Sequence, residues 1–356
     1  MKKFFMAAVA LLSLLGVASA MSSPLYILNW SVMGGGGGSS GSTNFVMGGT
    51  IGQSTGQVSS STSYSVQSGF WPPSGGPANI TNKPDEIGIY QSGAWYLDTA
   101  GTGNPATSTF HYFGAPCWTP LVGDWNGDNK TEISIYNDGA WYLDTAGTGN
   151  PATSTFHYFG GAGWTPVVGD WNGDGKTEIG IYHDGAWYLD LAGTGIASTA
   201  TFHYFGAPGW TPVVGDWNGD GKTEIGIYHD GAWYLDAAGT GNPATATFHY
   251  FGAPGWTPVV GDWNGDGKTE IGIYHDGAWY LDAAGTGNPA TATFHYFGAP
   301  VWTQVVGDWN SDGKTEIGIY HDGAWYLDLA GTGIASTATF HYFGAPGWTP
   351  VIGKWS

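Results

Sequence analysis

From Glu86 to the C-terminus, short stretches rich in β-branched and aromatic residues alternate with turn-forming residues, and no stretch has the periodicity or length of a helix. Four such stretches make one unit: EIGIY, AWYLD, ATFHYFG and TPVVGDW. Asp-Gly pairs such as Asp138-Gly139 and Asp184-Gly185 join the first two stretches, and such pairs predict tight two-residue hairpins. Each unit is therefore expected to be a small antiparallel sheet of four strands.

The units repeat every 46 residues, as the phrase GDWNGDGKTE shows. Its first aspartate is Asp124, Asp170, Asp216, Asp262 or Asp308. Four strands in a unit of this length are typical of a propeller blade. The alternative is an open β-solenoid, but solenoid coils are usually shorter and an open stack needs polar end caps. We therefore predict an all-β fold in which residues 86–356 form a six-bladed β-propeller of 46-residue, four-stranded blades.

The two ends of the repeat array predict how the ring closes. The first unit, which starts at Glu86, lacks a TPVVGDW stretch before it, whereas the chain ends with an extra copy at residues 349–355. If the C-terminal strand completes the first unit, six blades close and no sheet edge is left free at the junction. Lys354 agrees with this prediction, because it occupies the position of the motif aspartate in the one copy that no loop follows.

Three regions precede the repeats. Residues 1–20 have the pattern of a cleaved signal peptide: two lysines, a 14-residue apolar run and Ala18-Ser19-Ala20. That run is short for a membrane anchor, so we expect a secreted or cell-surface protein without membrane insertion. Residues 21–71 form a Gly/Ser-rich segment with short alternating apolar runs, which predicts a small N-terminal β segment. Residues 72–85 are the expected linker.

The acidic charge of the chain excludes some classes of partner. Its formal charge is −19, and loss of the signal peptide would leave seven of nine basic residues against 28 acidic ones, which makes −21. Nucleic acids need clustered cations, so we expect no nucleic-acid partner. Cys117 is the one cysteine, and an intramolecular disulfide is therefore impossible. Stability is expected to come from packing and from bound cations.

The repeated phrase carries the spacing of a metal-binding loop. Numbered from its aspartate, it reads D1-W-N3-G-D5-G6-K7-T-E9. Oxygen ligands at positions 1, 3 and 5, a glycine turn at position 6 and a carbonyl at position 7 suit calcium. The glutamate that an EF-hand has at position 12 is absent, since Ile135 stands there, so the pattern indicates a strand–loop–strand site. The alternative is that these are only Asx-rich turns.

This phrase, together with Phe113-Gly114-Ala115-Pro116 and its copies, resembles the FG-GAP/VCBS-type repeats of bacterial secreted and surface proteins, which are related to the integrin α-subunit propeller. The resemblance covers about residues 78–356 and implies a calcium-binding propeller with about five Ca2+ ions, one in each continuous loop between the first two strands of a blade. Position 9 is usually aspartate in that family, and Asn129 replaces the glycine at position 6 in the first loop. The implied ligands, with the lysines contributing carbonyls, are Asp124, Asn126, Asp128, Lys130 and Glu132; Asp170, Asn172, Asp174, Lys176 and Glu178; Asp216, Asn218, Asp220, Lys222 and Glu224; Asp262, Asn264, Asp266, Lys268 and Glu270; and Asp308, Asn310, Asp312, Lys314 and Glu316.

Aromatic and histidine side chains are the other candidates. Eighteen tryptophans belong to the repeats, three in each unit, and they either fill the wedges between blades or stack on sugars. Trp164 and its copies lie beside glycine and proline in a loop and are the best exposed candidates. His183 and its copies precede Asp-Gly turns, where adjacent solvated residues are expected rather than a catalytic pair. His111 and its copies lie within a strand.

No catalytic motif is present, and near-identical repeats give each carboxylate the same surroundings, whereas enzymes usually set acid and base in unlike environments. Repeated equivalent surfaces favour multivalent binding. We therefore expect a non-enzymatic binding or adhesion module for a glycan or an extracellular protein ligand. The alternatives are an extracellular polysaccharide-acting enzyme on a propeller scaffold and a structural component of an extracellular layer. The oligomeric state is not set by the sequence.

Overall fold

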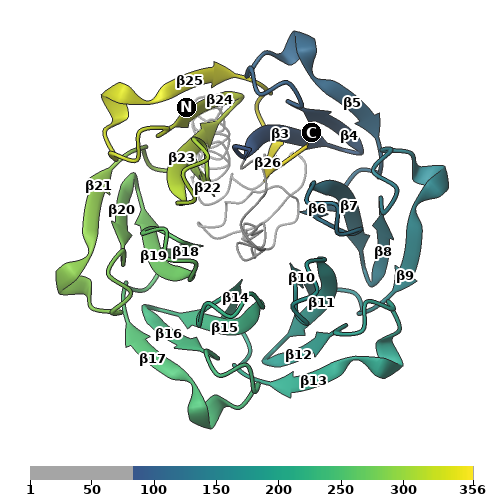
Figure 1. The fold of residues 1–356 in the computed structure, drawn as a ribbon, viewed down its shortest axis with the longest axis horizontal. Helices are drawn as coiled ribbons and strands as arrows, with labels where there is room; N and C mark the ends of the chain where they lie inside the picture. The colour runs from purple at the N-terminus through teal and green to yellow at the C-terminus, as the bar shows by residue number, and fades with distance from the viewer. Residues whose placement is uncertain (1–82, 356) are drawn as a thin grey trace, which may run out of the picture. The chain divides into compact units, whose positions relative to one another are not determined.

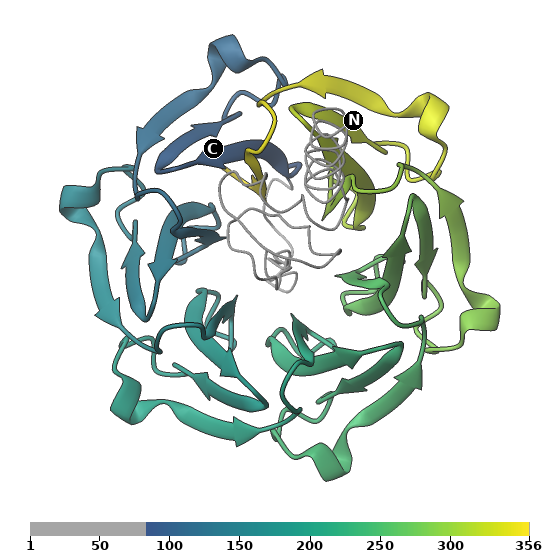
Figure 2. The same cartoon turned by 180° about the vertical axis from the view of Figure 1, so that it is seen from behind.

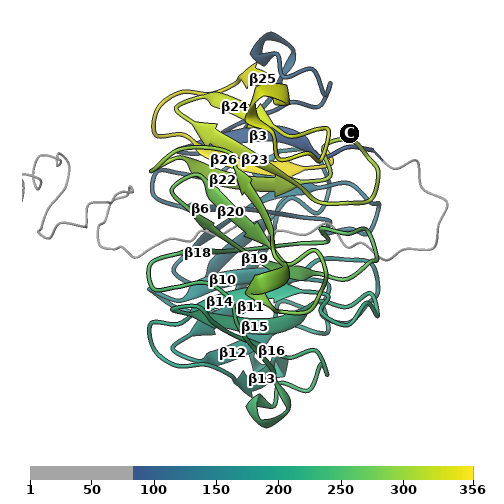
Figure 3. The ribbon, with the colours of Figure 1, turned by 90° about the vertical axis from the view of Figure 1, so that its left-hand side faces the viewer.

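Six four-stranded antiparallel sheets are arranged around a ring in the computed structural model, which describes residues 83–355 (Figure 1). The ring is seen from behind in Figure 2 and edge-on in Figure 3. The predicted all-β, six-bladed propeller is confirmed. The predicted signal peptide (1–20), the N-terminal β segment (21–71) and most of the linker (72–85) lie outside the described residues.

Each blade runs from the centre of the ring to its rim. The innermost strands carry the TPVVG stretch and are β6 (Thr119–Gly123), β10 (Thr165–Gly169), β14 (Thr211–Gly215), β18 (Thr257–Gly261), β22 (Thr303–Gly307) and β26 (Thr349–Gly353). The second strands are β3 (Glu86–Gln91), β7 (Glu132–Asn137), β11 (Glu178–His183), β15 (Glu224–His229), β19 (Glu270–His275) and β23 (Glu316–His321).

The third strands are β4 (Ala94–Leu97), β8 (Ala140–Leu143), β12 (Ala186–Leu189), β16 (Ala232–Leu235), β20 (Ala278–Leu281) and β24 (Ala324–Leu327). The outermost strands are β5 (Thr109–Tyr112), β9 (Thr155–Tyr158), β13 (Thr201–Tyr204), β17 (Thr247–Tyr250), β21 (Thr293–Tyr296) and β25 (Thr339–Tyr342). A single turn of 3-10 helix precedes each outermost strand: η3 (Pro105–Thr107), η4 (Pro151–Thr153), η5 (Ala197–Thr199), η6 (Pro243–Thr245), η7 (Pro289–Thr291) and η8 (Ala335–Thr337).

The C-terminal strand closes the ring. β26 pairs antiparallel with β3, so that Gly353 lies opposite Glu86 and Thr349 opposite Tyr90. Beyond the strand, the Trp355 backbone amide donates to Glu86 Oε2 at 3.0 Å. The predicted closure is therefore confirmed: one blade is assembled from both ends of the repeat array.

The hairpins between the second and third strands have the predicted geometry. Asp138 (φ 49°) and Gly139 (φ 97°) are both left-handed, as a two-residue turn of type I′ requires. Space also requires the glycine, because a Cβ on Gly139 would lie 2.9 Å from the carbonyl oxygen of Gly160. The hairpin turn and the chain leaving the outermost strand thus pack backbone against backbone.

Tryptophans fill the wedges between blades. The tryptophan of each AWYL strand is fully buried, and its indole Nε1 donates to the carbonyl of the phenylalanine after the outermost strand, as in Trp141 to Phe159 at 2.9 Å. The tryptophan that follows each innermost strand, such as Trp171 or Trp355, is also buried in a cluster with aliphatic side chains of the next blade. Burial of each ring contributes at least about 2 kcal/mol. The wedge-filling interpretation is confirmed for these twelve side chains.

Candidate metal loops and aromatic rim

The loop between the first two strands of a blade is organised by its own polar side chains. In the first loop, Asp124 Oδ1 accepts hydrogen bonds from the amides of positions 4 and 5 at 2.6 and 3.1 Å, and Asp124 Oδ2 accepts one from position 6 at 2.7 Å. Asn126 Oδ1 accepts from the position 5 amide at 2.8 Å, and Asp128 Oδ1 accepts from the position 7 amide at 2.9 Å. The side chains at positions 1, 3 and 5 therefore point into the curl of the loop.

Two positions of the loop require a left-handed backbone. Position 6 was predicted to do so, and it has φ 67° at Asn129 and φ 88° at Gly175. Position 4 does the same, with φ 83° at Gly127 and φ 68° at Ser311. The glycine at position 4 is thus as much a requirement of the loop geometry as the glycine at position 6.

The glutamate at position 9 reaches back into the loop from the first residue of the next strand. Glu132 Oε2 accepts from the Trp125 amide at 2.9 Å, and Glu132 Oε1 accepts from Asn126 Nδ2 at 3.0 Å. One carboxylate oxygen from each of positions 1, 5 and 9 therefore lies within 4.8 Å of the others. Five such clusters occur among the described residues: Asp124, Asp128 and Glu132; Asp170, Asp174 and Glu178; Asp216, Asp220 and Glu224; Asp262, Asp266 and Glu270; and Asp308, Asp312 and Glu316.

The donor set fits a hard divalent cation. Calcium–oxygen bonds are about 2.3–2.6 Å long, so oxygens around one ion lie within about 5 Å of each other, as these do. Burial, together with the smaller effect of the nearby carboxylates of Asp124 and Asp128, raises the pKa of Glu132 to about 8. The same holds for Glu178, Glu224, Glu270 and Glu316. A cation among the carboxylates would relieve their mutual repulsion.

The lysine at position 7 extends toward the preceding blade. A Cβ placed on Gly127 would lie 3.1 Å from Cγ of Lys176, so the lysine stem covers position 4 of the neighbouring loop. Lys222, Lys268 and Lys314 lie in the same way over Gly173, Gly219 and Gly265. The predicted metal contact of the lysine carbonyls stays a prediction from the resemblance.

The third tryptophan of each unit belongs to a row of stacked rings. Trp164 is half-buried, and its ring lies 5.0 Å from that of His183 and 5.5 Å from that of Tyr188, with interplanar angles of 7° and 19°. Phe202 then contacts Tyr188 at 5.1 Å between ring centroids. The Trp–Tyr–Phe row recurs in all six blades and runs outward to the outermost strand.

The most exposed aromatic rings lie on the outermost strands. Phe202 is 53% exposed and Tyr204 is 56% exposed. The equivalent exposed rings are Phe110, Tyr112, Phe156, Tyr158, Phe248, Tyr250, Phe294, Tyr296, Phe340 and Tyr342. We call these twelve rings the aromatic rim. These rings were not among the predicted candidates, although the alternation in TFHYFG places phenylalanine and tyrosine on one face of the strand and histidine on the other.

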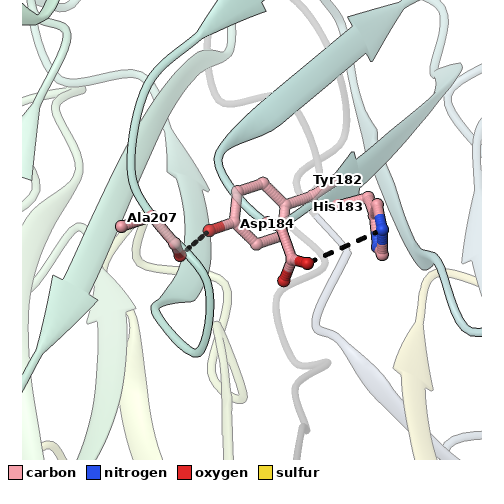
Figure 4. A network of polar contacts seen from close by, with 4 residues as sticks. All are labelled: Tyr182, His183, Asp184 and Ala207. Atoms are coloured by element: carbon pink, nitrogen blue, oxygen red, sulfur yellow. Dashed lines mark hydrogen bonds and ion pairs between the residues drawn. The ribbon is translucent and has the colours of Figure 1, made fainter.

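The two sets of histidines have separate environments. His183 Nε2 lies 3.7 Å from Asp184 Oδ2 at the hairpin turn, and both side chains are about half exposed (Figure 4). The adjacent Tyr182 hydroxyl donates to the Ala207 carbonyl at 3.0 Å, and burial raises the pKa of Tyr182 to about 12. The His183–Asp184 hairpin is therefore a turn that the Tyr182 hydroxyl fixes to the loop at Ala207. His111, by contrast, packs against Gly149 of the following blade, and burial lowers its pKa.

Comparisons with known proteins give little further. No protein-family model and no curated protein matches the chain. A solved structure described as a lectin of Agrocybe aegerita, with specific recognition of non-reducing terminal N-acetylglucosamine, has 16% sequence identity and a TM-score of 0.49, covering 72% of this chain and 75% of that chain. A likeness this distant says nothing about the ligand of the present chain. In residues 83–355, no helix is long and apolar enough to cross a membrane.

Proposed function

We propose that this chain is a secreted, calcium-binding β-propeller that acts as a multivalent, non-enzymatic binding or adhesion module for glycans, with extracellular proteins as the second class of ligand. The aromatic rim is the observation that carries the proposal. Exposed aromatic rings offer flat apolar faces to the C–H faces of sugars, and a soluble protein rarely leaves so many rings in water without a ligand or partner.

Repetition sets the expected mode of binding. The same pair, represented by Phe202 and Tyr204, recurs in six blades around one ring. Contacts at several blades to one branched or polymeric ligand add through a high effective concentration, so weak single sites give useful avidity. The net charge of −19 favours neutral or cationic glycans over acidic ones.

The five acidic clusters would hold calcium. Asp170, Asp174 and Glu178 would provide carboxylates in one loop, and Asn172 would provide its amide oxygen. Bound calcium would supply positive charge to a group of carboxylates that otherwise repel each other. The chain's own contribution is the hydrogen-bonded loop, which places the oxygens before the cation arrives.

A glycan array tests the ligand class, using the protein purified from the exported fraction. The test variant replaces the six rim phenylalanines by serine: Phe110, Phe156, Phe202, Phe248, Phe294 and Phe340. The control variant replaces five exposed threonines of the innermost strands by serine: Thr119, Thr165, Thr211, Thr303 and Thr349. We expect one glycan class to be bound by the natural chain and the control but lost in the rim variant. The single change Phe202→Ser should weaken binding only slightly.

Several results would contradict the proposal. Equal binding by the rim variant would remove the rim from the site, and absence of any glycan ligand would favour a protein ligand or a structural role. Turnover of a polysaccharide on the array would favour an enzyme. Export is tested separately, since N-terminal sequencing of the secreted chain should begin at Met21. Binding that survives EDTA would separate ligand recognition from calcium.

A further inference from the structure

The five candidate metal loops (residues 124–132, 170–178, 216–224, 262–270 and 308–316) are joined to one another by hydrogen bonds across the seams, which are the boundaries between neighbouring blades. The residue at position 8, which none of the proposed ligand sets includes, is a threonine in all five loops. Thr177 Oγ1 accepts a hydrogen bond from the Asp124 amide at 3.0 Å, and the Thr177 amide donates to the Asp124 carbonyl at 2.7 Å. The position 8 residue of one blade thus clamps position 1 of the loop before it.

The same pair of hydrogen bonds links the following loops: Asp170 to Thr223, Asp216 to Thr269, and Asp262 to Thr315. The distances from position 1 amides to threonine Oγ1 are 3.0–3.1 Å. The lysine stems over position 4 follow the same direction, from one blade to the loop of the preceding blade. Two independent contacts therefore reach across each of these seams into a metal loop.

The two hydrogen bonds with the threonine fix the backbone of the position 1 aspartate, and the geometry of the loop depends on this residue. The aspartate at position 1 accepts the amides of positions 4, 5 and 6 in most loops, so a shift of its backbone would displace the whole curl. Without a cation, the crowded carboxylates favour opening of the loop. A threonine from the next blade opposes that opening and raises the fraction of loops ready to bind.

We propose that Thr177, Thr223, Thr269 and Thr315 are positioning residues for calcium: each one preorganises the metal loop of the preceding blade, so that calcium affinity at that loop depends on the next blade. The inference rests on the calcium binding proposed above. It predicts that loss of the threonine hydroxyl weakens binding in the neighbouring loop and leaves the threonine's own loop unchanged. Preorganisation acts directly on the apparent affinity, which falls with the competent fraction.

The closing seam provides a matched control. Thr131 makes the same two bonds, to the amide and carbonyl of Lys354 at 2.9 and 2.8 Å, but Lys354 begins no metal loop. Thr131→Val and Thr315→Val therefore remove the same buried hydroxyl and keep its methyl packing. Each substituted residue lies at position 8 of a metal loop, but only Thr315 has a metal loop as its partner across the seam.

Calcium binding is measured by isothermal titration of the full chain. We expect five sites of unchanged affinity in Thr131→Val, and one site about fivefold weaker in Thr315→Val, the loss corresponding to one neutral hydrogen bond. Adding Asp266→Ala disables the loop at Asp262, and in that background Thr315→Val should have no further effect on the remaining four sites. Melting in EDTA should show similar losses for both threonine variants.

Equal weakening in both threonine variants would assign position 8 to its own loop and overturn the inference. Unchanged calcium affinity in Thr315→Val would also overturn the inference. So would a further loss of calcium affinity when Thr315→Val is added to Asp266→Ala. If the natural chain binds no calcium, the proposed metal function fails with it. A natural chain that binds calcium at five sites, with no difference between the two valine variants, overturns only the coupling.

Discussion

Asp85 and Asp308 are joined across a seam by two hydrogen bonds: the Asp308 amide donates to Asp85 Oδ2 at 2.8 Å, and the Asp85 amide donates to the Asp308 carbonyl at 2.8 Å. At the other five seams a threonine takes the part of Asp85. Burial raises the pKa of Asp85 to about 6, and the positive charge of Lys354 opposes that shift. Where the two ends of the array meet, Asp85 thus stands in place of the threonine of the other units, and Lys354 stands in place of their aspartate.

This pairing predicts that Lys354→Asp is destabilising, even though it restores the residue of the other repeats. The change removes the cation near the buried Asp85 carboxyl and adds a like charge, which should cost about 1–3 kcal/mol. Urea denaturation would measure the loss. Adding Asp85→Thr should recover most of it, and a double variant no better than Lys354→Asp alone would contradict the argument.

Deletion of residues 349–356 should prevent ring closure. It removes β26, leaves the edge of β3 without its partner strand, and exposes the side chains that pack on Val351 and Trp355. We expect loss of a cooperative thermal transition and association of the product through the open edge, detected by circular dichroism and size-exclusion chromatography. Deletion of Ser356 alone is the control and should leave both measurements unchanged. A monomeric truncated chain with the natural melting profile would contradict the role of β26.

The histidines of the outermost strands predict a loss of stability on acidification. Burial lowers the pKa of His111 and its five copies below the ordinary value of 6.5, so the unfolded chain takes up protons first. Their contribution to stability is complete above pH 6.5 and is lost as the pH falls through 6.5 toward the lowered pKa.

Replacement of all six by glutamine should therefore reduce the fall in unfolding free energy between pH 7.5 and pH 5. The buried loop glutamates titrate in the opposite sense, but they are present in both chains and cancel in the comparison. Serine at Thr119, Thr165, Thr211, Thr303 and Thr349, which are exposed and do not titrate, is the control and should leave the pH dependence as it is. An unchanged slope in the six-residue variant would show that the lowered pKa values do not affect folding.

Val301→Gly should stabilise the protein by about 1 kcal/mol. Val301 has φ 64° and its side chain is 90% exposed, so a β-branched residue holds a left-handed backbone without compensating contacts. Glycine stands at the equivalent position in four blades, and a Cβ there would meet nothing within 4 Å. The converse change, Gly255→Val, should destabilise by a similar amount, and thermal melting compares the two. Two shifts of the same sign would exclude backbone strain as the cause.

Removal of calcium should lower the melting temperature of the natural chain. A ligand that binds only the folded state stabilises it by about 4 kcal/mol per site when present at a thousandfold excess over its Kd. Scanning calorimetry with calcium and with EDTA gives the difference. Glu178→Gln and Glu270→Gln together should reduce the calcium-dependent shift in proportion to the two loops changed. An identical melting temperature with calcium and with EDTA would show that the acidic clusters bind no calcium and act only as turns.

Much of the fold follows from the sequence because repetition converts local patterns into architecture. The 46-residue period, the Asp-Gly hairpins and the extra TPVIGKW at the C-terminus together gave six blades and their closure, and Lys354 marked the junction. The convergence of Asp124, Asp128 and Glu132 also followed from spacing within one loop.

Contacts between blades could not be predicted in the same way. Thr177 bonds to Asp124 across 53 residues, and the periodicity of a unit does not reveal which faces of neighbouring units meet. The left-handed backbone at Gly127 likewise depends on the complete curl of the loop. The exposure of Phe202 could not be predicted, because aromatic residues in strands usually pack inward. Phe202 is exposed because its outermost strand has no further strand outside it.

The antiparallel pairing of β26 with β3 has a consequence for how the molecule is made. A polypeptide synthesised from its N-terminus must hold the blade of β3 incomplete until β26 emerges. During that interval the waiting position can accept the near-identical TPVVG strand of another unit or of a second nascent chain. The similarity of the copies would thus permit exchange of strands between molecules, and the attraction between Lys354 and the buried Asp85 carboxyl would favour the correct strand over copies that carry aspartate.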